Sequence, residues 1–169
     1  MDLNELLADL FGRVDEHVHE AVDGLDAEAL RTPPAEGANT VGWLVWHLTR
    51  VQDHHMSELL GQDQVWVLGE WPQRFGVEPD PDNTGYGHSA SDVVTIRPES
   101  AQVVIDYFDA VTARTKAFIG SVTEAELDRI VDKRWDPPVT LGVRLISVVD
   151  DEIQHAGQAS YARGMLDRR

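Results

Sequence analysis

Residues 39–61 read NTVGWLVWHLTRVQDHHMSELLG and decide the fold class. Their apolar residues recur three and four positions apart, which is the period of an α-helix that buries one face. This apolar stripe consists of Val41, Leu44, Val45, Leu48, Val51, His55 and Leu59. Asn39 or Thr40 can cap the start of the helix, and Gly61 can end it. The stretch therefore predicts one long amphipathic helix.

The same period appears in three further segments of the chain. They are residues 3–23 after the cap Asp2, residues 98–119 with Pro98 as the first helical residue, and residues 141–164 after the cap Thr140. Short helices are expected after Asp26 and at the capping box in residues 123–126. Four helices of about 20 residues are each about 30 Å long, which suits a four-helix bundle. The prediction is an all-α protein in which residues 1–169 form one domain.

Residues 62–97 connect the second and third predicted helices and show no persistent period. The segment is rich in glycine, proline and aspartate, which favour turns. A connection of this length without regular structure is more often functional than inert in a compact domain. We therefore expect it to shape a pocket beside the bundle.

The composition excludes several classes of partner and chemistry. The chain has 14 lysines and arginines against 30 aspartates and glutamates, and its net charge of −16 would repel nucleic acid and anionic lipid. It has no cysteine, so disulfides, thiolate ligands and a cysteine nucleophile are excluded. Any metal must be bound by nitrogen and oxygen. The sequence shows neither a basic leader nor an apolar membrane span, which predicts a cytoplasmic protein.

The last predicted helix places polar groups on its inward face. At 100° per residue, Arg144, Asp151, His155 and Gln158 fall within about 60° of one another, on a face that otherwise carries small and apolar residues. Buried groups of this kind are costly unless they are paired or bound to something. Asp151 and His155 are four positions apart, so both side chains can reach one metal ion. The alternative is an ordinary hydrogen-bonded pair on one helix.

A third metal ligand is expected from the facing helix of residues 39–61, which offers three histidines. His55 lies at the centre of the apolar stripe, whereas His47 flanks it. His54 lies two turns after His47, about 10.5 Å along the axis, which is too far for both to bind one ion. The pattern alone leaves His47 and His55 as alternatives.

Two segments resemble the signature helices of the DinB-like (YfiT-like) four-helix-bundle superfamily. They are WLVWHL at residues 43–48, followed by VQD at 51–53, and DEIQHAGQ at 151–158, followed by RG at 163–164. Within this superfamily the chain is similar to the mycothiol S-transferases of actinobacteria and to the bundle domain of mycothiol-dependent maleylpyruvate isomerase. TGYGH at 84–88 and PPVTLGV at 137–143 resemble the transferase branch. The resemblance covers nearly the whole chain.

The resemblance implies a divalent metal ion, zinc or nickel, bound by one histidine of the second helix and a pair of residues on the fourth. By position these ligands are His47, Asp151 and His155. The resemblance thus favours His47 over His55. Relatives carry histidine or glutamate where this chain has Asp151, so Glu152 is the alternative carboxylate ligand.

Two histidines and one carboxylate leave a fourth position open, which is typical of a catalytic zinc site. The function expected from the resemblance is a metal-dependent thiol S-transferase. Metal coordination lowers the pKa of the mycothiol thiol, and the thiolate attacks an electrophile. Arg144 is expected to orient the carboxylate ligand or an anionic group, Tyr86 and His88 to close over the pocket, and Trp43 and Gln158 to contact the cofactor.

Composition agrees with this expectation in three ways. Because the chain has no cysteine, the reactive sulfur would arrive with a cofactor. The net charge of −16 favours mycothiol, which lacks the carboxylates of glutathione and bacillithiol. Arginine supplies 12 of the 14 basic residues, a bias typical of a GC-rich genome and hence of an actinobacterial source.

Two other functions are compatible with the same residues. A metal-activated water in place of the thiol would make the protein a hydrolase, and an assay without thiol separates these two reactions. A bundle that binds a metal, ligand or partner without chemistry is the third hypothesis, which elemental analysis of the purified protein would test. A homodimer is also compatible with the sequence, because exposed helix faces of small bundles often pair.

Overall fold

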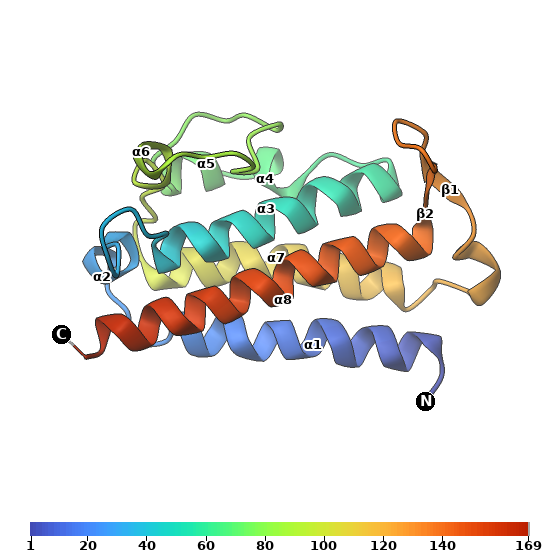
Figure 1. Cartoon of the computed structure of the whole chain (residues 1–169). Coiled ribbons are helices and arrows are strands. Elements are labelled where there is room, and N and C mark those ends of the chain that lie inside the picture. Colours follow the sequence, from blue (N-terminus) through green and yellow to red (C-terminus); the bar gives the residue numbers. More distant parts are fainter. Residues whose placement is uncertain (169) are drawn as a thin grey trace.

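The computed structural model describes residues 1–168, and these form a four-helix bundle (Figure 1). The long helices are α1 (Leu3–Val22), α3 (Val41–Leu60), α7 (Ala101–Ile119) and α8 (Leu141–Leu166). Helix α3 packs between α8 and α7, and α1 closes the bundle by packing on both of them. Figure 1 shows α1 and α8 running in one direction and α3 and α7 in the other. The predicted all-α four-helix bundle is confirmed.

The ends of three long helices lie where the sequence predicts them, because the caps are local. Asp2 accepts a hydrogen bond from the Glu5 N–H in a capping box at the start of α1. The hydroxyl of Thr40 accepts from the Trp43 N–H, and that of Thr140 caps α8 in the same way. The left-handed Gly61, with φ of 61°, ends α3.

The predicted start of the third long helix at Pro98 is wrong. Helix α7 begins at Ala101, because the Ser100 hydroxyl accepts a hydrogen bond from the Val103 N–H and so acts as the N-cap. The carbonyl of Pro98 instead accepts hydrogen bonds from the Arg31 guanidinium at 2.9 and 2.6 Å. Pro98 therefore belongs to the connection that precedes the helix.

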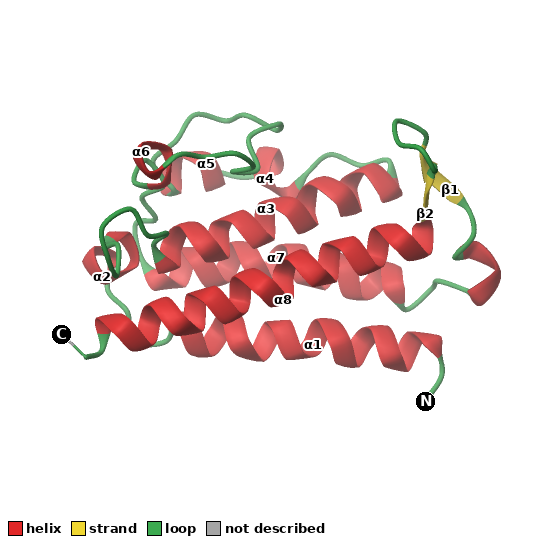
Figure 2. Ribbon diagram, viewed as in Figure 1, coloured by secondary structure: helices red, strands yellow, loops and turns green. Residues whose placement is uncertain are grey.

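The connection between α3 and α7 contains three short helices and lies over α3 (Figure 2). They are α4 (Val65–Leu68), α5 (Trp71–Arg74) and α6 (Ala90–Val93). The aromatic rings of Trp66, Trp71 and Phe75 each pack within 6 Å of the Tyr107 ring of α7. The segment is therefore packed against the bundle, which explains why every residue of α3 from 41 to 50 is buried.

The remaining elements are small. Helix α2 (Ala27–Arg31) follows Asp26, and the 3₁₀ helix η1 (Glu124–Glu126) begins at the predicted capping box. Strands β1 (Ile130–Asp132) and β2 (Val139–Thr140) pair antiparallel just before α8, and the sequence analysis did not predict them. Among the described residues, no helix is both long and apolar enough to cross a membrane.

Candidate metal centre

His47 of α3 and Asp151 and His155 of α8 meet where these two helices pack together. Asp151 Oδ1 lies 3.9 Å from His47 Nε2 and 3.6 Å from His155 Nε2, and each residue offers a donor atom within 4.8 Å of the other two. Both separations are too long for hydrogen bonds. Two donors about 2.1 Å from one tetrahedral ion lie roughly 3.4 Å apart, so the spacing fits ligands around a shared ion.

The proton positions on the two imidazoles also fit metal ligands. His47 Nδ1 lies 2.5 Å from the carbonyl oxygen of Thr84. Because a carbonyl only accepts hydrogen bonds, Nδ1 carries the proton and Nε2 keeps its lone pair. His155 Nδ1 pairs in the same way with Gln158 Oε1 at 3.0 Å. Both Nε2 lone pairs therefore face Asp151, with outer partners of the kind that orient metal-bound histidines.

The electrostatics of this site favour a cation. Asp151 Oδ2 is buried and has no hydrogen-bond partner among residues 1–168. Burial lowers the pKa of His47, which favours its neutral form. The interaction with the Asp151 carboxylate raises the pKa of His155. When both imidazoles are neutral, their Nε2 lone pairs and the Asp151 carboxylate repel one another. A proton on His155 Nε2, which its raised pKa favours, or a divalent cation between the three groups relieves this repulsion.

Trp43 fixes the planes of both imidazoles. Its ring stacks on His47 with centroids 4.8 Å apart and planes 8° from parallel, and it meets His155 at 6.3 Å and 89°. Its indole Nε1 donates to His88 Nδ1 at 3.1 Å, and His88 Nε2 donates to Asn83 Oδ1 at 3.0 Å. The structure thus places Trp43 directly against two ligand candidates and His88 behind Trp43, with both of its ring nitrogens engaged.

A cavity of about 320 Å³ lies next to His47 and Asp151. Its other lining residues come from α3, the long connection and α8: Val51, His54, His55, Asp82, Thr84, Tyr86 and Ser147. Tyr86 lines this cavity and is 93% exposed, so it lies at the cavity mouth. The cavity gives a small molecule access to the candidate metal centre, and the long connection shapes it as expected.

Arg144 has partners other than the expected Asp151. Its Nη2 donates to Asp132 Oδ2 of β1 at 2.9 Å, and its Nη1 donates to His55 Nε2 at 3.3 Å. The structure therefore connects Arg144 to the strand pair rather than to the candidate ligand. Glu152 does not belong to the group formed by His47, Asp151 and His155. Its side chain is fully buried.

Glu152 of α8 is fully buried. Neither carboxylate oxygen has a hydrogen-bond partner in the described part of the chain. Burial raises the pKa of Glu152 well above its usual value, and the charge of Asp151 adds to the shift. Its raised pKa thus favours the neutral form of Glu152, the alternative carboxylate ligand.

His54, His55 and Glu58 form a second cluster with two histidines and one carboxylate, here named the His54 cluster. Its imidazole lone pairs are already used. His54 Nδ1 accepts from Gln64 Nε2 at 3.2 Å, and His55 Nε2 accepts from Arg144. The ring N–H groups therefore face Glu58, whose Oε2 lies 3.3 Å from His55 Nδ1. This proton arrangement does not suit a metal ion.

Sequence reasoning missed the residues that support His47 from the long connection. The carbonyl of Thr84 and the side chain of Asn83 lie next to the site, and the buried Arg50 and Asp53 lie about one and two turns after His47 on α3. The sequence signal that could have identified them is the pair of opposite charges, Arg50 and Asp53, three positions apart in a helix whose other residues are mostly buried. Such a pair requires satisfied partners, which the sequence does not identify.

The fold and the site together define a helical-bundle protein with a candidate metal centre of two histidines and one carboxylate. A family model for mycothiol-S-transferases matches residues 6–168, so the chain belongs to the mycothiol-S-transferase family. This finding confirms the resemblance seen in the sequence.

Among solved structures, the crystal structure of a conserved protein from Enterococcus faecalis is similar to this chain. It is 30% identical in sequence, with a TM-score of 0.90 over 100% of this chain and 99% of that one. The match supports the four-helix architecture over its full length. No curated protein matched the sequence.

Proposed function

We propose that the protein is a metal-dependent S-transferase that joins the thiol of mycothiol to an electrophilic co-substrate. Membership in the mycothiol-S-transferase family supports the thiol and the reaction class. In the reaction, a bond forms between the thiol sulfur and the electrophilic carbon, and the thiol proton and the leaving group are released. We further propose that His47, Asp151 and His155 hold a divalent ion, with zinc as the first candidate and nickel as the second.

The ion would supply positive charge that lowers the pKa of a thiol at its open position. The chain's own residues prepare this position. The Thr84 carbonyl and Gln158 keep the protons of the two histidines on Nδ1. Trp43, which is 5% exposed, excludes water from one side of both imidazoles. The neighbouring cavity gives the co-substrate room beside Ser147 and Tyr86.

One observation carries this proposal: the Nε2 atoms of His47 and His155 lie 3.9 and 3.6 Å from Asp151 Oδ1, and the other oxygen of this carboxylate, Oδ2, is buried without a hydrogen-bond partner among the described residues. The experiment has two parts. Elemental analysis of the purified protein should find one divalent metal ion per chain. The same protein should then conjugate mycothiol to 1-chloro-2,4-dinitrobenzene, which is followed by absorbance.

Three results would contradict the proposal. Activity unchanged in His155→Ala would exclude the metal centre from the reaction. Turnover of an electrophile without thiol would indicate a hydrolase. A protein that binds metal but consumes no electrophile with any thiol would be a binding protein.

A further inference from the structure

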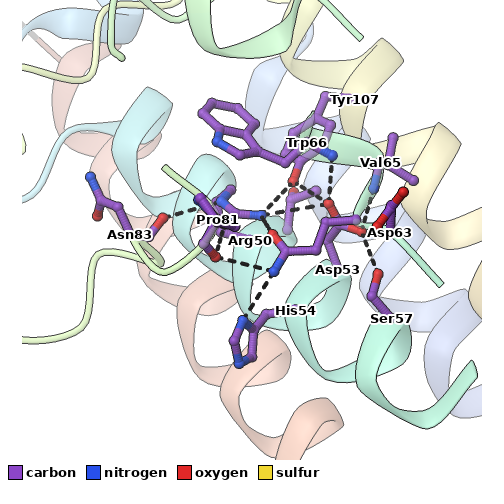
Figure 3. Close-up of polar contacts among 12 residues, drawn as sticks. Arg50, Asp53, His54, Ser57, Asp63, Val65, Trp66, Pro81, Asn83 and Tyr107 are labelled. Carbon is purple, nitrogen blue, oxygen red and sulfur yellow. Dashed lines mark hydrogen bonds and ion pairs between the residues drawn. The ribbon is translucent and has the colours of Figure 1, made fainter. Parts of the chain in front are cut away.

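Arg50 and Asp53 form a buried ion pair on α3, about one and two turns after His47 (Figure 3). Both side chains are 0% exposed, and Arg50 Nη1 lies 3.5 Å from Asp53 Oδ2. Removing two charges from water costs several kcal/mol per ion unless many hydrogen bonds compensate. A well-packed apolar pair is often as stable. Stability alone therefore does not explain this ion pair, and the groups that its hydrogen bonds position are the more informative feature.

Arg50 contacts the far end of the long connection. Its Nε donates to the Asn83 carbonyl at 3.2 Å, and its Nη2 donates to the Pro81 carbonyl at 2.9 Å. Its Nη1 donates to Gln64 Oε1 at 2.8 Å, and Gln64 in turn donates to the Pro81 carbonyl at 3.1 Å. One guanidinium thus fixes three acceptors of the long connection and also donates to the Tyr107 hydroxyl at 3.4 Å, which its planar set of five N–H groups allows.

Asp53 contacts the near end of the same connection. It accepts hydrogen bonds from the Val65 N–H at 2.9 Å and the Trp66 N–H at 2.8 Å. The hydroxyl of Tyr107 donates to it at 2.9 Å, and burial raises the pKa of Tyr107, which keeps this donor protonated. The ion pair therefore attaches both ends of residues 64–83 to one position on α3.

The fixed end of the connection continues directly to His47. Asn83 is followed by Thr84, whose carbonyl pairs with His47 Nδ1. Asn83 Oδ1 accepts from the Gly85 N–H at 3.2 Å, which closes a tight turn around this carbonyl. A Cβ on Gly85, whose φ is +90°, would lie 2.9 Å from His47 Nδ1. The backbone thus approaches the imidazole closely, and its position depends on Asn83.

We propose that Arg50 is a positioning residue for the candidate metal centre. By fixing the Asn83 carbonyl, Arg50 aligns the next carbonyl, that of Thr84, with His47 Nδ1. This alignment keeps the proton on Nδ1 and the lone pair on Nε2, where an ion would bind. The inference rests on the proposed function for its biological meaning, but its structural effect is measurable in the metal-free protein.

The first test is Arg50→Lys, which keeps one positive charge beside Asp53 but cannot donate to three fixed acceptors. Long-range ¹H–¹⁵N correlation spectra of the metal-free protein report the tautomer of His47. The wild-type protein should show the Nδ1–H form, and Arg50→Lys should show a mixture of both forms. Its Kd for Zn²⁺ should rise about 10- to 100-fold, which is the usual effect of losing an outer partner of a metal ligand.

The control is a core variant of α1, Val18→Ala, compared with Arg50→Lys by urea unfolding. Val18 is fully buried on α1, and its aliphatic side chain forms no hydrogen bonds. Val18→Ala should lose stability but keep the wild-type tautomer of His47 and the wild-type Kd for Zn²⁺. A shift of the tautomer in this control would show that general loss of stability is sufficient, which would overturn the proposal.

A double variant, Arg50→Met with Asp53→Asn, keeps the test informative if Arg50→Lys does not fold. It removes both buried charges, and the asparagine oxygen can still accept from one of the two backbone N–H groups, at residue 65 or 66, that donate to separate oxygens of Asp53. We expect a folded protein with a shifted His47 tautomer. A folded double variant with the wild-type tautomer and the wild-type Kd for Zn²⁺ would overturn the positioning role.

The two proposals fail separately. A wild-type protein that does not bind Zn²⁺ would contradict the proposed function. A tautomer shift in metal-free Arg50→Lys would still establish that Arg50 controls His47.

Discussion

Two clusters, each of two histidines and one carboxylate, both include residues of α3, and the structure gives them opposite proton arrangements. In the first cluster, the outer partners of His47 and His155 accept hydrogen bonds; they are a backbone carbonyl and a side-chain amide oxygen. The His54 cluster has outer partners that donate, the Gln64 amide and the Arg144 guanidinium. The first arrangement turns lone pairs toward the carboxylate, and the second turns N–H groups toward it. The outer partners, rather than the residue types, therefore distinguish the two clusters as candidate metal sites.

The charges around the two carboxylates differ in the same sense. Glu58 of the His54 cluster lies 3.3 Å from the Arg134 guanidinium, and Arg134 and Arg144 both pair with Asp132 of β1. Positive charge is thus already present there. Asp151 has a buried oxygen without a partner among the described residues. The His54 cluster is best explained as a structural connection between α3, α8 and the strand pair.

The largest expected effect is the loss of metal binding in one cluster only. His47→Ala should raise the Kd for Zn²⁺ more than about 100-fold, because even outer partners of a ligand are worth about 10- to 100-fold. His54→Ala should leave the Kd unchanged, because the lone pair of His54 Nδ1 is used by Gln64. Isothermal titration and elemental analysis measure both variants. If His54→Ala lost zinc and His47→Ala retained it, the His54 cluster would be the metal site and this prediction would be wrong.

The second prediction concerns the pH dependence of stability in the metal-free protein. Burial, and then the charge of Arg144, lower the pKa of His55 to about 4 from 6.5. Between these two pH values the unfolded chain binds a proton that the folded chain does not, so the free energy of unfolding decreases as the pH falls. For one site the decrease is about 3 kcal/mol over this window.

The variant His55→Gln should remove this part of the pH dependence, since glutamine does not titrate and can still accept from Arg144. Urea unfolding of both proteins at pH 7 and pH 4.5 measures the difference. The buried His47 contributes equally to both proteins, so it cancels. An identical pH dependence in the wild type and the variant would show that His55 is not the responsible group.

The sequence predicts the helices better than the candidate site because helix signals are local. The caps Asp2, Thr40 and Thr140 act on residues three positions away, so they are visible in the sequence. The start of α7 is an exception, because the helix begins after the N-cap Ser100 and not at Pro98. The strand pair escaped prediction because it is only two and three residues long.

The candidate site combines local and distant information. Spacing alone pairs Asp151 with His155, because they lie one turn apart on α8. Spacing does not choose between His47 and His55, and the family resemblance was needed for that choice. The structural difference between them arises from partners far away in the sequence, the Thr84 carbonyl for His47 and Arg144 for His55. An irregular connection has no period from which such contacts can be predicted.

The third prediction uses two glycines of the same loop, Gly85 and Gly87. Both have positive φ, so alanine is strained at either position. A Cβ on Gly85 would also lie 2.9 Å from both His47 Nδ1 and the Trp46 ring, whereas no described atom lies within 4 Å of a Cβ on Gly87. Gly85→Ala should therefore raise the Kd for Zn²⁺ about 10- to 100-fold by displacing the Thr84 carbonyl. Gly87→Ala should lower stability slightly and keep the Kd. Equal Kd values for the two variants would show that the loop does not orient His47.

The smallest expected effect belongs to Gln158, the outer partner of His155. Gln158 is exposed, so in Gln158→Ala a water molecule can take the place of its amide oxygen next to His155 Nδ1. The Kd for Zn²⁺ should therefore rise about tenfold, at the low end of the range for outer partners. Glu58→Gln in the His54 cluster is the matched control and should leave the Kd unchanged. Isothermal titration of both variants measures this difference. A larger effect from Gln158→Ala than from Gly85→Ala would mean that His155, rather than His47, depends most on its outer partner.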